Sequence, residues 1–136
     1  MLHSLELTGV GPAEHLEIEL QPRVNLITGD NGLGKTFLLD VAWWVLGRTW
    51  ASGYQALPRR GAKDAKIGYV VDIKRSREKR YESVFDRASQ QWKRSTGRPP
   101  SPGLVLYARA DGGFSLWDPA RNYWRDSPSL GISDPT

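Results

Sequence analysis

The sequence predicts an α/β fold, and three observations support this prediction. Segments before residue 30 alternate between apolar and polar residues, as half-buried strands do. A glycine-rich turn at residues 29–36 leads into an apolar segment of helical length. The remainder holds β-branched and aromatic runs between turn residues, which is typical of antiparallel strands. We therefore expect a mixed sheet, one helix after the turn, and an antiparallel β-rich meander.

The first strands are predicted from their alternation. Residues 2–8 form one strand, which "GVGPAE" ends, and residues 15–20 form a second with leucine and isoleucine on one face. The short apolar run "VNLIT" at residues 24–28 predicts a third strand, central and buried.

The segment after the glycine-rich turn predicts a buried helix over residues 35–46, with Gly47 as its stop. Asp40 is the single charge over residues 37–46, and a helix that is apolar on all sides is normally buried. No run reaches the roughly 18 apolar residues of a membrane span, so we expect no membrane association.

The rest of the chain predicts a β-rich subdomain over residues 67–124. Strands are expected at residues 66–75 and 80–88 around the turn "SREK", and residues 89–95 could extend the second. A Pro/Gly loop follows. After it we expect a hairpin, with strands at residues 104–109 and 114–117 on either side of the turn "ADGG". No closing element is visible after Trp124, so we expect residues 1–136 to be a single, incomplete lobe, with residues 1–47 as its strands, loop and first helix.

Composition sets limits on function. The net charge of +4 permits an anionic partner without requiring one. Cysteine is absent, which excludes disulfides and thiolate metal sites and agrees with a cytoplasmic protein. The opening "MLHSLELTGVG" has no basic region and no long apolar region, so we predict no signal peptide.

The motif "GDNGLGKT" carries the functional prediction. Gly29, Gly34, Lys35 and Thr36 match G-x-x-x-x-G-K-[ST] between a predicted strand and a predicted helix. Such glycines let backbone N–H groups surround a phosphate, the lysine reaches the β- and γ-phosphates, and the threonine hydroxyl ligates Mg²⁺. The helix N-terminus adds its positive dipole end. The alternative is a glycine loop that only caps the helix.

Residues 2–47 resemble the N-terminus of RecF-like, SMC-like and OLD-like ATPases with ABC-type heads, a group that also includes AAA proteins. The resemblance rests on the turn "GVGPAE", the loop "GDNGLGKT" and its inner pair Asn31-Gly32. It implies that the loop holds ATP and Mg²⁺, with Lys35 as the catalytic residue and Thr36 on the metal. The implied ATP-binding residues are Gly29, Asp30, Asn31, Gly32, Leu33, Gly34, Lys35, Thr36 and Phe37. For adenine, His3 or the turn "GVGPAE" are the candidates.

Other parts of an ABC-type site are missing from the sequence. There is no "hhhhDE" Walker B motif and no "LSGGQ"-like signature. Asp72 ends an apolar run, but Ile73 takes the place of the glutamate, and a solvent-facing strand end explains Asp72 better. Gln55, Gln90 and Gln91 are available as γ-phosphate sensors, without a convincing setting.

Basic and aromatic residues leave two interpretations open. The cations of the middle third could face DNA, although nearby carboxylates favour a solvated surface; they are Arg59, Arg60, Lys63, Lys66, Lys74, Arg75, Arg77, Lys79 and Arg80. Several aromatic residues could stack on bases, but in strands they are more often core or cross-strand pairs. These are Trp92, Tyr107, Trp117, Tyr123 and Trp124.

Two functional hypotheses follow. In the first, the chain binds ATP and hydrolyses it when Walker B and signature segments and a partner head complete the site. The resemblance then implies an ATP-sandwiched homodimer, possible DNA and nuclease partners, and a role in DNA repair or phage defence. In the second, it is a non-hydrolysing nucleotide- or nucleic-acid-binding interaction module.

Overall fold

The computed structural model describes residues 1–30, 32, 34–74, 77–94 and 103–118. The chain divides into two compact units, Met1–Pro102 and Gly103–Thr136, and each is described by itself. The expected polar tail after Trp124 lies outside the described residues, as do Tyr123 and Trp124 themselves and most of the Pro/Gly loop. Within the described residues, no helix has the length and apolar character needed to cross a membrane.

The first unit is built on a five-stranded sheet of order β2-β1-β3-β4-β5. Its strands are β1 (Leu2–Thr8), β2 (His15–Glu19), β3 (Lys66–Lys74), β4 (Arg77–Asp86) and β5 (Gln91–Trp92). The predicted strands at residues 2–8, 15–20 and 66–75 are therefore confirmed over Leu2–Thr8, His15–Glu19 and Lys66–Lys74, and residue 75 lies outside the described residues. Every pairing among the described strands is antiparallel, so the sheet that we predicted as mixed is antiparallel in this part of the chain.

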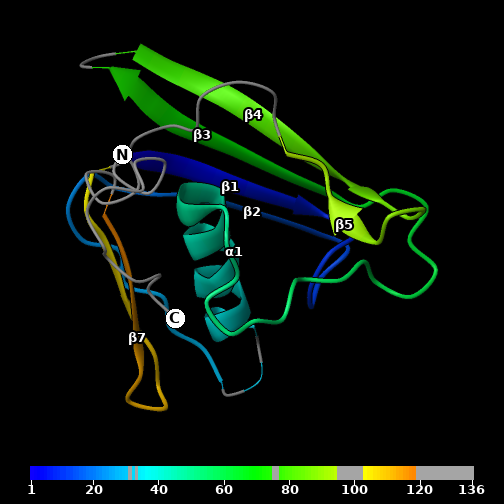
Figure 1. Cartoon of the computed structure of the whole chain (residues 1–136), viewed down its shortest axis with the longest axis horizontal. Helices are drawn as coiled ribbons and strands as arrows, with labels where there is room; N and C mark the ends of the chain where they lie inside the picture. The colour runs from blue at the N-terminus through cyan, green and yellow to red at the C-terminus, as the bar shows by residue number, and fades with distance from the viewer. Residues whose placement is uncertain (31, 33, 75–76, 95–102, 119–136) are drawn as a thin grey trace, which may run out of the picture. The chain divides into compact units, whose positions relative to one another are not determined.

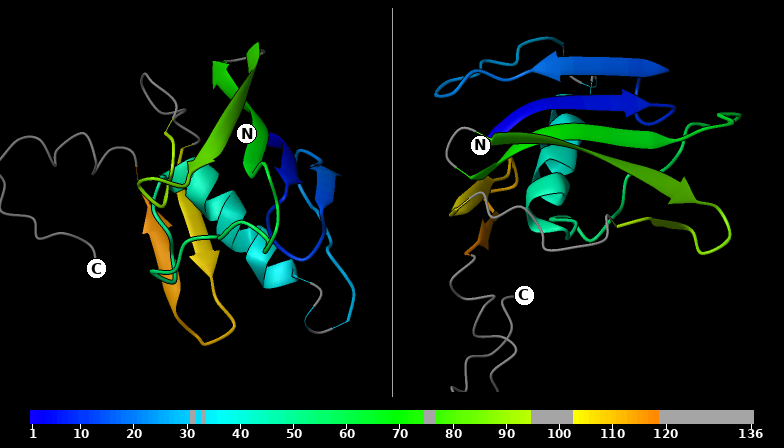
Figure 2. Two further views of the ribbon diagram at one scale, coloured as in Figure 1. Left: turned by 90° about the vertical axis from the view of Figure 1, so that its right-hand side faces the viewer. Right: turned by 90° about the horizontal axis from the view of Figure 1, so that it is seen from above.

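Helix α1 (Lys35–Gly47) crosses one face of this sheet, as Figures 1 and 2 show. Its Val41 and Val45 are almost fully buried and belong to one core cluster with Leu5, Leu7 and Ile67 of the sheet. The helix is not buried on all sides, however, because Leu39 is 45% exposed. Arg48 in the left-handed region, at φ 58°, ends it and donates its backbone N–H to the Trp44 carbonyl at 2.7 Å, one position later than the stop that we predicted.

The predicted central strand at residues 24–28 is wrong. These residues are not in a strand, and Val24 and Leu26 are 80% and 86% exposed. A strand requires a neighbour whose N–H and C=O groups complete its ladder, and no described segment pairs with these residues. Apolar composition alone therefore misled the prediction, since it reports a preference for burial and not the presence of a partner.

The strands that follow α1 differ from expectation in their limits. β4 begins at Arg77, earlier than predicted, because β3 and β4 pair almost up to the turn, through Lys74 and Arg77. Residues 89–95 were expected to extend it. They contribute the short strand β5, in which Trp92 is buried and donates its Nε1–H to the Ala56 carbonyl at 2.8 Å.

The second unit contains the predicted hairpin. β6 (Val105–Ala108) pairs with β7 (Phe114–Trp117), and these strands form a two-stranded sheet. The turn at "ADGG" uses Gly112 at φ 84°, a conformation that suits glycine. Asp111 supports it, because its Oδ1 accepts a hydrogen bond from the Gly113 backbone N–H at 2.8 Å.

Candidate nucleotide-binding loop

The glycine-rich loop leads directly into α1, which begins at Lys35. Gly29, Gly32 and Gly34 all have positive φ angles, of 147°, 88° and 83°. Side chains with a Cβ rarely adopt this region, so the glycines are needed for the path of the backbone. Gly34 is the N-cap residue of α1, and its carbonyl accepts the Leu38 N–H at 2.9 Å. The helix that was predicted after the motif is therefore present, whereas the strand that was predicted before it is not.

The turn between β1 and β2 packs against the start of this helix. A Cβ added to Gly34 would lie 2.6 Å from Cγ of Pro12, and one added to Gly11 would lie 2.4 Å from the ring of Phe37. Two glycines, one on each side, thus allow the "GVGPAE" turn and the loop to approach each other closely. Their contact fixes the loop's helical end relative to the sheet.

Arg59 holds the same turn from a third segment. Its Nη1 donates to the carbonyls of Gly11 at 3.0 Å and of Pro12 at 2.6 Å. The backbone of Arg59 also donates to the Gly9 carbonyl at 2.9 Å, and Val10 forms a β-bridge with Pro58. The loop after α1 therefore supports the turn that packs on the glycine loop.

Lys35 points back over the loop. Its Nζ donates to the carbonyls of Gly29 and Asp30, both at 2.6 Å. An ammonium group in this place is surrounded by the loop's own backbone, where a phosphate bound in the loop would meet it. The carbonyls satisfy the lysine in the conformation seen here.

Four of the other predicted site residues are exposed in the described part of the loop. Gly29, Asp30, Gly32 and Thr36 are exposed, and Phe37 is half-buried against the turn. Asn31 and Leu33 belong to the predicted set but lie outside the described residues. Among the described residues, the loop thus combines exposed glycine backbone, a lysine ammonium and a threonine hydroxyl at one helix end.

Other predicted contributors lie elsewhere. His3 contacts Asp72 of β3, with 2.7 Å between Nε2 and Oδ1, so its side chain is hydrogen-bonded near the start of β1. Gln55, Gln90 and Gln91 line a different hollow of about 420 Å³ beside Trp44 and Trp50. Gln55 is also bonded to the Gln90 carbonyl at 2.7 Å. The structure does not bring these residues to the glycine loop.

Four of the middle-third cations, Arg59 among them, contact protein groups in the described part of the chain. Arg80 forms an ion pair with Glu6, Lys66 lies 3.7 Å from Glu82, and Lys79 stands 4.8 Å above the ring of Tyr81. Trp92 is in the core and Tyr107 is buried, so neither offers an open face for a base. These contacts agree with the solvated-surface interpretation. Arg75 lies outside the described residues.

Comparison with known families agrees with this geometry. The AAA domain family matches residues 4–110, which include the glycine loop, α1 and strands β3 to β6. The chain belongs to the AAA domain family. The match confirms the resemblance to AAA-type ATPases of the ABC/SMC-like group, and it assigns this AAA domain a general nucleotide-binding or ATPase function. No curated protein matches the chain.

Sequence reasoning missed Arg59 and Pro12 as supports of this loop. In the sequence Arg59 is one of several cations of a loop, and its contact with the Gly11 and Pro12 carbonyls spans 48 and 47 residues. The glycines of "GVGPAE" were the available signal, since a glycine outside a simple turn can mark close backbone approach.

Proposed function

We propose that this AAA domain binds ATP with Mg²⁺ at the loop formed by residues 29–37. The observation that carries the proposal is the path of Gly29, Gly32 and Gly34, all with positive φ, into a helix that begins with Lys35 and Thr36. Gly29, Asp30 and Gly32 of this path are exposed, and the helix adds its positive end, so the loop favours a polyphosphate. In this assignment Lys35 contacts the β- and γ-phosphates and Thr36 ligates Mg²⁺.

The turn between β1 and β2 is the better of the two candidates for contacts with adenine. Pro12 and Gly11 of this turn lie against Gly34 and Phe37 of the loop, whereas His3 is bonded to Asp72. A hollow of about 360 Å³ adjoins the turn and is lined by Thr8, Gly9, Glu14 and residues 59–64. Its mixture of backbone and polar side chains suits the edge of a base.

Hydrolysis requires groups that this sequence does not contain. Asp72 lacks a following glutamate and lies in β3, where it contacts His3. We therefore propose turnover only where Walker B and signature segments and a second head complete the site. An ATP-sandwiched homodimer, a nuclease partner, DNA, and a cytoplasmic role in DNA repair or phage defence are proposals that rest on the resemblance.

The test is ATP binding by the chain and its Lys35→Ala variant, measured by calorimetry with Mg²⁺ present. We expect the substitution to remove most triphosphate affinity, because the lysine ammonium is the loop's main positive charge. Lys79→Ala is the matched control, since Lys79 is an exposed cation of β4 outside both the loop and the hollow beside the turn. Equal ATP affinity in the wild type and the Lys35→Ala variant would contradict the proposal, and salt-sensitive DNA binding that ignores Mg-ATP would favour the interaction module.

A further inference from the structure

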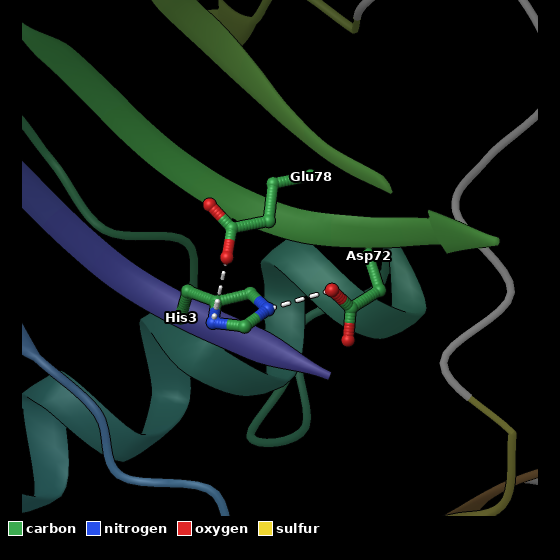
Figure 3. A group of neighbouring side chains, drawn as sticks. All are labelled: His3, Asp72 and Glu78. Carbon is green, nitrogen blue, oxygen red and sulfur yellow. Dashed lines mark hydrogen bonds and ion pairs between the residues drawn. The ribbon is translucent and has the colours of Figure 1, made fainter. Parts of the chain in front are cut away.

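A second group of side chains that could act as ligands lies at the end of the sheet where β1 and β4 begin and β3 ends. His3 of β1, Asp72 of β3 and Glu78 of β4 gather on one side of the three strands, and Figure 3 shows the imidazole between the two carboxylates. His3 Nε2 lies 2.7 Å from Asp72 Oδ1, and His3 Nδ1 lies 3.5 Å from Glu78 Oε1. None of the three belongs to the glycine loop.

Irregular strand pairing accompanies this arrangement. The register between β1 and β3 shifts between Leu2 and Ser4, and that between β3 and β4 shifts between Asp72 and Lys74. Such a shift changes the direction of the side chains beside it, and bulges commonly re-aim side chains at functional positions. The first shift falls at His3, and the second comes directly after Asp72.

The donor set is one that binds cations. Imidazole nitrogen suits zinc and its neighbours in the first transition row, while carboxylate oxygen suits hard and borderline ions. One ligand atom from each residue can be chosen so that all three lie within 4.8 Å of one another. Two ligand atoms of a tetrahedral zinc ion, each about 2.1 Å from it, are about 3.4 Å apart, so side chains of the set must rotate to bind one ion. Glu78 can make this rotation because its side chain is 61% exposed.

We propose that His3, Asp72 and Glu78 bind one divalent transition-metal ion of the Zn²⁺ class, separate from the Mg²⁺ of the nucleotide loop. One ring nitrogen of His3 and one oxygen of each carboxylate are the ligands, and water completes the coordination.

Neighbouring charged groups affect the ability of Asp72 to bind a metal ion. Asp72 also forms an ion pair with the Met1 amino group, with 3.0 Å between the nitrogen and Oδ2. The hydrogen bonds from His3 first, and from the Met1 amino group second, hold the pKa of Asp72 below its usual 3.8. Asp72 is therefore ionised at neutral pH, as a ligand must be, and the Met1 ammonium is the cation that competes most directly with the metal.

The experiment is a calorimetric titration of the chain with Zn²⁺ in the absence of nucleotide. We expect one saturable site, and we expect His3→Gln, Asp72→Asn and Glu78→Gln each to weaken it by about tenfold or more, as changes near metal ligands do. His15→Gln and Glu82→Gln are the matched controls. His15 is the chain's other histidine, bonded to Thr8 at the opposite end of β1, and Glu82 is an exposed carboxylate of β4.

Glu78→Gln decides the test if the other variants fold poorly, because this exposed side chain is outside the core. Far-UV circular dichroism of each variant confirms its fold. Absence of saturable Zn²⁺ binding by the wild type would overturn the proposal, and so would an equal loss of affinity in the His15→Gln or Glu82→Gln control. Because no nucleotide is present, this result is independent of ATP binding at Lys35.

Discussion

Gly34 is the residue at which two separate constraints on the candidate loop meet. Its φ of 83° disfavours any side chain, and Pro12 occupies the space that a Cβ would take. The motif explains the first constraint from the sequence, since the loop must turn sharply before α1. The second depends on a contact across 22 residues of sequence, which no local pattern reveals.

Gly34→Ala is expected to destabilise the chain more than Gly53→Ala does. Gly53 is the matched control because its φ is 76° and nothing lies within 4 Å of its added Cβ, so it reports backbone strain alone. That strain costs about 1–2 kcal/mol per residue, and Gly34→Ala adds the overlap with Pro12. Urea unfolding of both variants measures the difference, and equal losses would show that Pro12 simply moves away.

At the scale of elements, a prediction succeeds or fails according to how far apart in the sequence the interacting residues are. The alternation of residues 2–8 and the Asp-Gly turn of the hairpin depend on near neighbours, and both are confirmed. Residues 24–28 fail as a strand because pairing depends on a partner elsewhere. The supports of the loop, which are Pro12 and Arg59, were missed for the same reason.

Arg59 gives this element-scale account a direct test. Replacing Arg59 by Met removes the two hydrogen bonds to the Gly11 and Pro12 carbonyls while keeping an apolar stem of similar length. Hydrogen bonds from charged donors contribute about 1.5–3 kcal/mol, and partial exposure favours the lower end here. We expect a comparable loss in the free energy of unfolding and weaker ATP binding, measured by urea titration and calorimetry.

Arg60→Met is the control for this variant, because Arg60 is the exposed neighbour. Its stability should stay close to that of the wild type. A loss as large as that of Arg59→Met would mean that the positive charge of this segment matters, and not the two hydrogen bonds to the turn.

At the scale of the whole molecule, the apolar residues of the first unit fall into a buried set and an exposed set. Leu5, Leu7, Ile67 and Val41 are fully buried between sheet and helix, while Val24 and Leu26 of the approach to the loop are exposed. The sequence predicted burial for both sets. The difference is that the first set has a packed partner layer and the second has none among the described residues.

Leu5→Ala and Leu26→Ala should therefore differ strongly. Leu5 is 0% exposed, and such core truncations cost about 2–5 kcal/mol. Leu26 is 86% exposed, and surface changes of this kind stay within about 0.5 kcal/mol. Denaturant unfolding of the two variants measures both values. A large loss for Leu26→Ala would show that residues 24–28 are buried in the chain in solution.

The position of Lys35 has a consequence for the energetics of any anion that enters the loop. The ammonium already has two oxygen partners, the carbonyls of Gly29 and Asp30. A phosphate that takes the lysine must displace these carbonyls, so ligation is an exchange of partners. The net heat of that step is the difference between the contacts of Lys35 with the phosphate and its contacts with the two carbonyls. The contacts with the carbonyls hold the loop in the shape described above.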